Sequence, residues 1–176
     1  MNVKQALDLK QYIRDVPDFP QAGVLFRDIT PLLADPRAFS FAVDALTNPY
    51  LNGGVDAIVG IESRGFLFGA PLAYRLHVPL IPVRKSGKLP AKVMSVEYAL
   101  EYGNAQLDIH VDAVQAGQRV AVVDDVLATG GTARAAASLV ELLGGEVVAM
   151  LFLVELEFLS GRQRLTQYDV HSLVKF

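Results

Sequence analysis

The chain has 176 residues, of which 52% are hydrophobic and 20% are charged, and its formal net charge is −3 at pH 7. This length and composition predict one α/β domain with a sizeable core, and they exclude a disordered chain. The absence of cysteine excludes disulfides and thiolate metal sites, and the modest negative charge argues against a nucleic-acid partner.

Local patterns exclude further classes of protein. No apolar run approaches the roughly 18 residues that a transmembrane helix needs. The N-terminal residues carry charges every few positions and contain no apolar signal segment. His77, His110 and His171 share no ligand spacing, so no metal site built by the protein alone is predicted. Together these patterns predict a soluble, cytoplasmic protein with no membrane partner.

The predicted elements begin with a helix. Apolar residues at helical spacing predict a helix over residues 3–13, which must end before Pro17 because helical backbone is disfavoured before a proline. Prolines and glycines break residues 18–36 into a loop-rich passage. Beyond it, helices and apolar strands alternate. In chain order we expect a helix over 38–46, a strand over 55–62, a turn and helix over 63–77, a strand over 78–85, a polar hairpin or flap over 86–114, a strand over 119–125, a helix over 132–145, and strands over 146–156 and 168–176.

The alternation of strands and helices predicts right-handed βαβ units and a mainly parallel central sheet flanked by helices. Ligands of such sheets bind beyond the carboxyl ends of the strands. Residues 62–65 and 124–132 both lie at ends of predicted strands, so we expect them to face one crevice. No linker divides the chain, which is predicted to be a single domain over residues 1–176. Its least core-like stretch, residues 85–104, is expected to form a flexible lid.

The segment VAVVDDVLATGGT, residues 120–132, ends a buried strand with two acids and continues into a turn of small residues and a helix. Gly130 and Gly131 allow the backbone to approach a ligand closely, and Thr129 and Thr132 add hydroxyl donors. The amino end of the helix adds free N–H groups and the positive end of its dipole. The turn therefore predicts a site for one phosphate group. The P-loop pattern G-x-x-x-x-G-K-[ST] and the dinucleotide pattern G-x-G-x-x-G are both absent.

Asp124 and Asp125 are expected to bind a different part of the ligand, because carboxylates repel a neighbouring phosphate. Carboxylates accept hydrogen bonds from the vicinal hydroxyls of a ribose, and they also attract Mg²⁺, directly or through its waters. The residues alone leave both interpretations open.

The same segment resembles the 13-residue signature of the type I phosphoribosyltransferases. Other segments resemble the adenine phosphoribosyltransferase family in particular, from about Asp18 to the end of the chain. These segments are DFPQAGVLFRDITPLL, GIESRGFLFGAPLA, RKSGKLP, LEYG and LVELEFLSGR. The resemblance implies the type I phosphoribosyltransferase fold, with an N-terminal loop that binds the base. It also implies transfer of the 5-phosphoribosyl group from 5-phosphoribosyl 1-pyrophosphate to adenine, which yields AMP and pyrophosphate in purine salvage. Mg²⁺ bound mainly through the phosphoribosyl donor and a homodimer are further implications.

Carried over position by position, the resemblance assigns a role to each motif. The residues assigned to the ribose 5-phosphate are Asp124, Asp125, Ala128, Thr129, Gly130, Gly131 and Thr132. The residues assigned to the pyrophosphate are Ser63 and Arg64 at a strand end and Arg84 and Lys88 in the flap. The residues assigned to adenine are Leu25, Phe26 and Arg27.

Ala128 indicates that the catalytic acid or base lies outside the phosphate turn. In 6-oxopurine transferases an aspartate commonly precedes the Thr-Gly of the signature and handles the purine proton, whereas this chain has Ala128 there. Proton transfer on the purine then requires another group. The resemblance in LEYG points to Glu101, with Tyr102 beside it, as the catalytic pair.

Two other functions remain open at this point. A transferase of the same fold could act on xanthine or hypoxanthine, although Ala128 and the segment VLFRD argue against it. A regulator could keep the fold, bind the phosphoribosyl donor or a purine, and control a nucleic acid. Such a regulator needs a basic face or an added DNA-binding domain, and neither is evident in the sequence.

Overall fold

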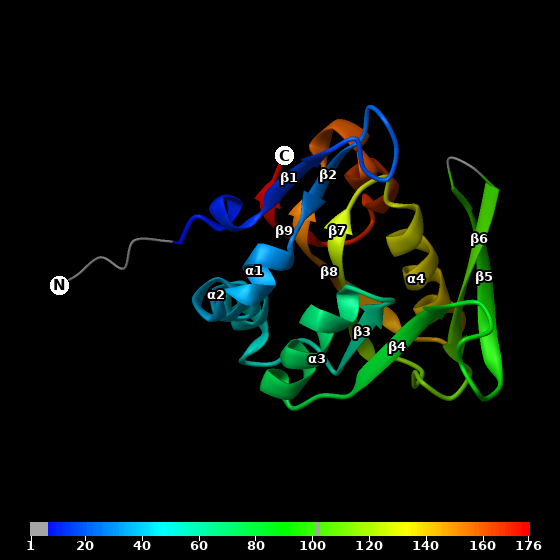
Figure 1. Ribbon diagram of the computed structural model, residues 1–176. Coiled ribbons are helices and arrows are strands. Elements are labelled where there is room, and N and C mark those ends of the chain that lie inside the picture. The colour runs from blue at the N-terminus through cyan, green and yellow to red at the C-terminus, as the bar shows by residue number, and fades with distance from the viewer. Residues whose placement is uncertain (1–6, 101–102) are drawn as a thin grey trace. The chain divides into compact units, whose positions relative to one another are not determined.

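Seven strands form the main sheet in the described part of the computed structural model, which covers residues 7–100 and 103–176 (Figure 1). The chain divides into two compact units, Met1–Ala45 and Leu46–Phe176. The first unit contains a two-stranded sheet, and the second contains the seven-stranded one.

The N-terminal unit is built on an antiparallel pair of strands, β1 (Arg14–Pro17) and β2 (Leu25–Asp28). The short 3-10 helix η1 (Leu9–Tyr12) precedes this pair. Helix α1 (Thr30–Ala34) and most of α2 (Pro36–Thr47) follow it. The helix predicted over residues 38–46 is thereby confirmed.

Two other predictions for this unit are wrong. In its described part, the helix predicted over residues 3–13 is only the η1 turn, and Arg14 already belongs to a strand. The passage 18–36, predicted as loop-rich with no strand or helix named in it, contains β2 and α1. The cause is long-range pairing: Arg14 Nη2 lies 2.6 Å from Asp28 Oδ2 across the β1–β2 ladder. Pairing between distant segments leaves no periodic pattern in either of them.

The strands of the second unit follow the order β5-β6-β4-β3-β7-β8-β9. Strands β4, β3, β7, β8 and β9 are parallel, whereas β6 runs antiparallel to β4, and β5 to β6. The predicted mainly parallel sheet is therefore confirmed. The strand bounds are β3 Ala57–Ile61, β4 Leu80–Lys85, β5 Val93–Leu100, β6 Gly103–His110, β7 Arg119–Leu127, β8 Glu146–Glu155 and β9 Val170–Lys175, and short 3-10 helices span Asn48–Tyr50 (η2), Glu157–Leu159 (η3) and Gly161–Leu165 (η4).

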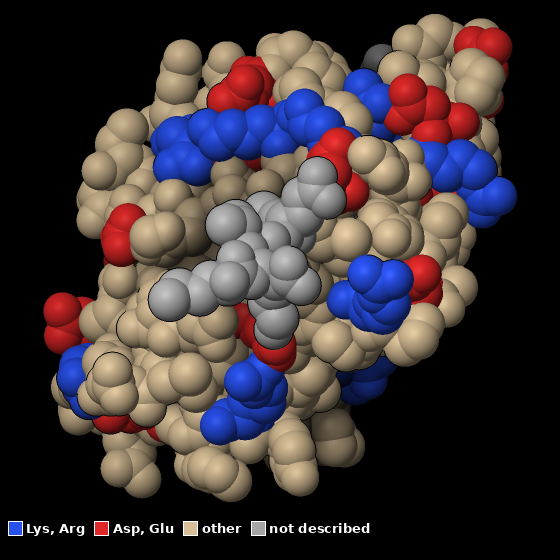
Figure 2. Space-filling model, turned by 90° about the vertical axis from the view of Figure 1, so that its left-hand side faces the viewer, with Lys and Arg blue, Asp and Glu red and all other residues tan. Residues whose placement is uncertain are grey.

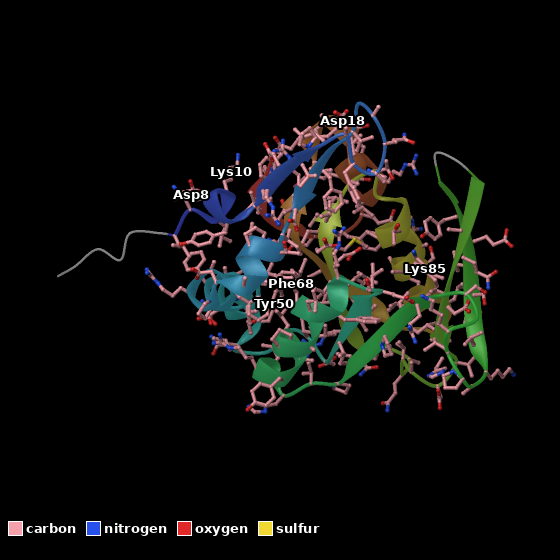
Figure 3. All side chains as sticks on the ribbon, viewed as in Figure 1. Asp8, Lys10, Asp18, Tyr50, Phe68 and Lys85 are labelled. Atoms are coloured by element: carbon pink, nitrogen blue, oxygen red, sulfur yellow. The ribbon has the colours of Figure 1, made fainter. Side chains whose placement is uncertain are left out.

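Two helices cover the opposite faces of this sheet. Helix α4 (Gly131–Leu142) packs on the face that carries Val122. Helix α3 (Gly65–Leu76) packs on the other face, where Gly69 lies against the side chains of Ile58 and Leu80. Its Phe68 is completely buried (Figure 3). Strands covered on both sides need apolar side chains at successive positions, which explains the uninterrupted apolar run of β8.

Strands β5 and β6 form a long antiparallel hairpin, as predicted for the polar stretch over residues 86–114. In the described residues, β6 pairs with β4 only at Arg84↔Asp108 and Lys85↔Leu107. The hairpin therefore joins the sheet at its base. The mobility expected of residues 85–104 stays a prediction.

Asp108 ties the base of this hairpin to the preceding turn. Its buried carboxylate accepts hydrogen bonds from Gly87 N at 3.1 Å, Ser95 Oγ at 2.8 Å and Gln106 Nε2 at 2.9 Å. Burial raises the pKa of Asp108, but these hydrogen bonds to the charged form outweigh it, and the pKa is lowered. The Asp108 carboxylate thus holds the turn at residues 86–88 against the base of the hairpin.

The surface carries charges of both signs. On the face seen in Figure 2, the described Lys and Arg side chains lie interspersed with Asp and Glu side chains rather than in one continuous basic surface. Over the described ranges, no helix combines the length and the apolar character needed to cross a membrane.

Candidate active site

The candidate site lies at one edge of the sheet, where β3 and β7 end. These strands are parallel neighbours, with Gly60 opposite Val123, so their carboxyl ends meet. Gly65, which follows β3, lies directly on β7: a Cβ there would come within 2.7 Å of Val123 O and 3.0 Å of Asp124 Oδ1. This close approach requires glycine. The two segments predicted to face one crevice, residues 62–65 and 124–132, are therefore in contact, and a crevice shared by both stays a prediction.

An ion pair joins the two strand ends. Arg64 Nε lies 2.8 Å from Asp125 Oδ2, and the Asp125 side chain is only 6% exposed whereas that of Arg64 is 40% exposed. The strand predicted to end at Asp125 continues to Leu127, because β7 stays paired with β8 as far as Glu155. Both acids are therefore held by strand geometry rather than by a loop.

The two acids differ in their environment. Asp124 is half-buried, and its Oδ1 accepts a hydrogen bond from Asp125 N at 2.8 Å. Burial, followed by the charge of Asp125, raises the pKa of Asp124 well above its ordinary value. Burial also raises the pKa of Asp125, but the charge of Arg64 partly offsets this effect. Burial therefore disfavours the charged form of both carboxyls, that of Asp124 more than that of Asp125.

The turn that follows β7 encloses a small cavity. Gly130 adopts a left-handed backbone with φ 80°, which directs the chain into α4, and no side chain caps the amino end of this helix. The first N–H groups of a helix lack intrahelical partners, and an uncapped end offers them to an anion. The cavity has a volume of about 60 Å³, and it is lined by Asp124, Val126, Leu127, Ala128, Thr129, Gly130, Thr132 and Ala133.

The end of β3 resembles the end of β7, because a helix without a side-chain cap follows it closely. Helix α3 begins at Gly65 directly after Arg64, and no side chain caps its amino end either. Ser63 is exposed, and the peptide bond between Glu62 and Ser63 is cis. The sheet edge therefore presents two uncapped helix ends, one after β3 and one close to the end of β7.

The predicted pyrophosphate residues of the flap meet at Glu62, a residue that sequence reasoning missed. The Glu62 side chain is 8% exposed, and it accepts hydrogen bonds from Arg84 Nε at 3.2 Å, Lys85 N at 3.0 Å and Lys88 Nζ. Arg84 Nη1 also donates to Lys88 O at 3.0 Å. Burial raises the pKa of Glu62, but the hydrogen bonds from Lys88, Lys85 and Arg84 lower it by more. Glu62 is thus a charged partner that holds both cations, and its place as the first residue of the segment ESRGF, residues 62–66, was the available signal.

The three residues predicted to bind adenine lie together on β2 of the N-terminal unit. The Leu25 side chain is exposed, and Phe26 packs edge-on against Phe19 with ring centroids 5.1 Å apart. Arg27 forms an ion pair with Asp15 on β1. Because side chains alternate along a strand, Leu25 and Arg27 lie on one face of β2 and Phe26 on the other, so the structure does not bring the three side chains together on one face.

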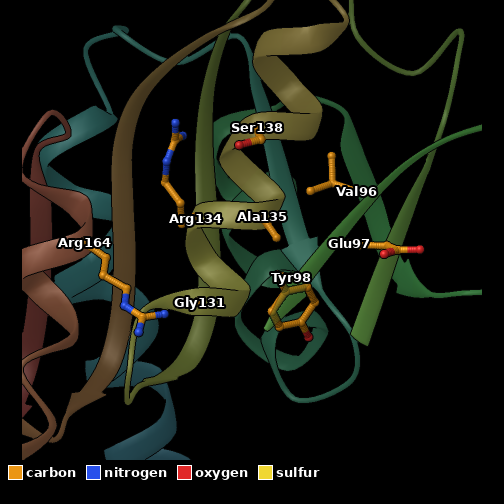
Figure 4. A pocket seen from close by; sticks show the side chains of 8 residues that line it. All are labelled: Val96, Glu97, Tyr98, Gly131, Arg134, Ala135, Ser138 and Arg164. Carbon is orange, nitrogen blue, oxygen red and sulfur yellow. The ribbon is translucent and has the colours of Figure 1, made fainter. Parts of the chain in front are cut away.

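The predicted catalytic pair, Glu101 and Tyr102, lies outside the described residues. A nearby residue of the hairpin was not predicted: Tyr98 on β5 places its hydroxyl 3.4 Å from Thr132 Oγ1, which donates to it. A second cavity of about 180 Å³ lies between part of the hairpin and α4 (Figure 4). Its lining residues are Val96, Glu97, Tyr98, Gly131, Arg134, Ala135, Ser138 and Arg164. The hairpin therefore contacts the first turn of α4, beside the phosphate turn.

Comparison with known proteins identifies the family. Residues 36–172 match the family model of the phosphoribosyl transferase domain. The sequence is similar to the adenine phosphoribosyltransferase of Caldanaerobacter subterraneus subsp. tengcongensis, with 56% identity over 96% of this chain and 98% of that protein. The structure is similar to the crystal structure of adenine phosphoribosyltransferase from Thermoanaerobacter pseudethanolicus, with a TM-score of 0.91 and 57% identity over 96% of this chain and 98% of that one.

A third similar protein was crystallised with ligands. It is the adenine phosphoribosyltransferase of Saccharomyces cerevisiae, in complex with D-2,5-dideoxy-2,5-imino-altritol 1,6-bisphosphate and adenine. Its TM-score is 0.88, with 42% identity over 93% of this chain and 95% of that one. On the agreement of sequence, fold and site geometry, the chain belongs to the adenine phosphoribosyltransferases, within the phosphoribosyltransferase family.

Proposed function

We propose that this chain transfers the 5-phosphoribosyl group from 5-phosphoribosyl 1-pyrophosphate to adenine, and that it releases AMP and pyrophosphate in purine salvage. The proposal rests on one observation at the edge of the sheet. Asp124 lines the cavity of the phosphate turn, and Asp125 follows it and donates a hydrogen bond to it. This edge combines groups for sugar hydroxyls with groups for a phosphate, in a chain of this family.

The ribose 5-phosphate is proposed to bind along this edge. Ala128, Thr129, Gly130, Gly131 and Thr132 hold the 5-phosphate through backbone N–H groups and hydroxyls. The uncapped amino end of α4 supports this role, because it leaves donors and a positive dipole end for an anion.

The sugar hydroxyls are assigned to Asp124 and Asp125. Carboxylate oxygens accept hydrogen bonds from the vicinal hydroxyls of a ribose. As positive charge develops on the sugar in the transition state, negative charge on the pair stabilises it.

The leaving pyrophosphate is proposed to bind Ser63, Arg64, Arg84 and Lys88. The contact between Arg64 Nε and Asp125 orients the guanidinium fork of Arg64, whose side chain is partly exposed. Glu62 keeps Arg84 and Lys88 close together. Cations fixed in advance stabilise the charge that accumulates on the leaving group without reorganising during the reaction.

The base is proposed to bind Leu25, Phe26 and Arg27, and Glu101 with Tyr102 is proposed to handle the purine proton. The assignment of Leu25, Phe26 and Arg27 depends on the sequence resemblance, and these residues share the strand β2. The assignment of Glu101 and Tyr102 depends on the sequence resemblance and on the alanine at position 128.

Mg²⁺ is proposed as the cofactor, bound mainly through the donor. The described residues contain no cluster of three or more His, Cys, Asp or Glu side chains able to hold a metal ion. No residue of the chain is proposed as a direct ligand of the ion, which suits Mg²⁺ because this ion commonly takes its oxygen ligands from substrate phosphates and water. The ion would neutralise charge on the pyrophosphate. A homodimer is also proposed, from the sequence resemblance alone, and a cytoplasmic location is proposed from the charge and hydropathy pattern of the sequence.

The decisive experiment offers four bases separately to the protein with Mg²⁺ and 5-phosphoribosyl 1-pyrophosphate: adenine, hypoxanthine, guanine and xanthine. We expect AMP from adenine and little nucleotide from the others. A nucleotide formed from another base, with no AMP, would show a different base specificity. No nucleotide from any base would contradict the transferase function and favour a regulator.

A further inference from the structure

A second glycine, Gly161, lies directly behind the phosphate turn. A Cβ built on Gly161 would come within 2.8 Å of Gly130 N and 2.9 Å of Ala128 C, and closer still to Ala128 O. Conversely, a Cβ built on Gly130 would lie 3.1 Å from Gly161 C and closer to its carbonyl oxygen. The backbones of residues 128–130 and of Gly161 therefore touch, with no room for a side chain on either one.

The segment that carries Gly161 is firmly attached to the sheet. Leu156 N donates to Leu127 O at 2.9 Å, which joins the end of β8 to the end of β7. Arg162, next to Gly161, donates from Nε and Nη2 to the buried Glu155 at 2.9 and 2.6 Å. Its Nη1 also donates to Val170 O at 2.8 Å. Hydrogen bonds to an ionised, buried carboxylate lower the pKa of Glu155 to about 2. Gly161 is thus held from its C-terminal side by a rigid charged pair.

We propose that Gly161 is a positioning residue for the ribose 5-phosphate site, and that the segment Ser160–Arg162 forms the rear wall of the phosphate turn. Gly161 determines where Ala128 O and Gly130 N lie, and so it sets the direction of the first N–H groups of α4. This inference rests on the proposed function, because it assumes that residues 128–132 bind the 5-phosphate.

The contact with Gly161 explains one feature of the phosphate turn that the sequence of residues 128–132 does not explain. Gly130 needs its left-handed backbone, but it also has to be small because Gly161 O occupies the space that a Cβ would take. Ser160 adopts a left-handed backbone with φ 53°, which brings the Gly161 carbonyl toward the turn. Anion sites made of backbone N–H groups depend on the direction of those groups, so a displaced turn binds phosphate less well.

The test is the Gly161→Ala variant, with binding of two ligands measured by isothermal titration calorimetry: ribose 5-phosphate, and pyrophosphate with Mg²⁺. The added methyl group must displace the Ala128 carbonyl and the Gly130 amide. We expect the dissociation constant for ribose 5-phosphate to rise about tenfold or more, from the loss of charge-assisted hydrogen bonds, and that for pyrophosphate to change less than about twofold.

A matched control is Gly69→Ala, in which the added methyl group meets the flexible end of Leu80 at 3.3 Å and lies away from the phosphate turn. This variant should bind both ligands as the wild type does. Circular dichroism verifies that each variant is folded. If Gly161→Ala does not fold, the double variant Glu155→Gln/Arg162→Gln loosens the same wall without leaving a buried charge unpaired, and it should show a smaller loss confined to ribose 5-phosphate.

The outcomes separate the inference from the proposed function. An unchanged ribose 5-phosphate affinity in the folded variant, or an equal loss for both ligands, would overturn the role of Gly161 while leaving the transferase function intact. A wild-type chain that neither binds ribose 5-phosphate nor forms AMP would remove the proposed function, and the inference with it.

Discussion

Arg64 and Asp125 link the carboxyl ends of β3 and β7 through an ion pair between Nε and Oδ2, 2.8 Å apart. One residue is proposed to bind the leaving pyrophosphate and the other a ribose hydroxyl. Under these two proposals, the ion pair joins the pyrophosphate side of the donor site to its ribose side.

The Asp125→Asn variant tests this link. It removes the buried charge that orients the guanidinium of Arg64, so we expect the KM for the phosphoribosyl donor to rise about tenfold or more. Steady-state kinetics at varied donor and saturating adenine measure this change. The control is Asp56→Asn, which breaks the exposed ion pair with Arg119 at the opposite ends of the same strands. An unaltered donor KM in Asp125→Asn would contradict the ribose assignment.

The Asp124→Asn variant should stabilise the fold while it weakens donor binding. A carboxyl whose folded-state pKa is raised makes the folded state less stable as the pH rises from its unfolded pKa through its folded one. Asparagine lacks this titration and still accepts the hydrogen bond from Asp125 N. We expect the free energy of unfolding at pH 7 to increase.

Urea unfolding of wild type and Asp124→Asn at pH 4.5, 6 and 7.5 measures the effect, and the difference should grow with pH. Asp56 provides a control of opposite sign, because hydrogen bonds from Arg119 lower its pKa to about 2. Its contribution is present above the unfolded pKa and is lost only as the pH falls toward 2. A difference between wild type and Asp124→Asn that does not vary with pH would be evidence against a raised pKa.

The Glu62→Gln variant tests the anchor of the flap cations. The new amide side chain can accept a hydrogen bond from Lys85 N, but it no longer attracts Arg84 and Lys88, which lose their common charged partner. We expect the donor KM to rise about fivefold and the inhibition constant of pyrophosphate to rise with it. The adenine KM serves as the internal control and should not change. A lower donor KM would instead mean that Glu62 competes with pyrophosphate for these cations.

The Glu101→Ala variant tests the proposed proton transfer. Removal of a group that acts only in the transition state lowers kcat more than it raises KM, and we expect a decrease in kcat of about 10²-fold or more. Glu97→Ala is the matched control, because Glu97 is an exposed carboxylate on β5 of the same hairpin. If kcat is the same in Glu101→Ala and Glu97→Ala, Glu101 has no part in the mechanism.

The sequence by itself determined the elements and motifs whose causes are local. Apolar strands alternating with helices predicted the parallel sheet, because strands buried on both faces need continuous apolar runs. The acids followed by Gly130 and Gly131 predicted an anion site, because the geometry of a helix amino end depends on a few adjacent residues. The resemblance to the family, together with Ala128, predicted that the purine acid or base lies outside this turn, and this stays a prediction.

Only the tertiary structure decided what depends on residues far apart in the chain. Arg64 and Asp125 are separated by the whole hairpin, and they meet because β3 and β7 pair in parallel. The strand β2, within a passage predicted as loop-rich, forms because β1 pairs with it. Glu62 forms ion pairs with Arg84 and Lys88, and Gly161 packs against the backbone of the phosphate turn. Both sets of contacts arise only when the chain folds. Such contacts leave no spacing in the sequence, because chain distance and spatial distance are unrelated once the sheet has formed.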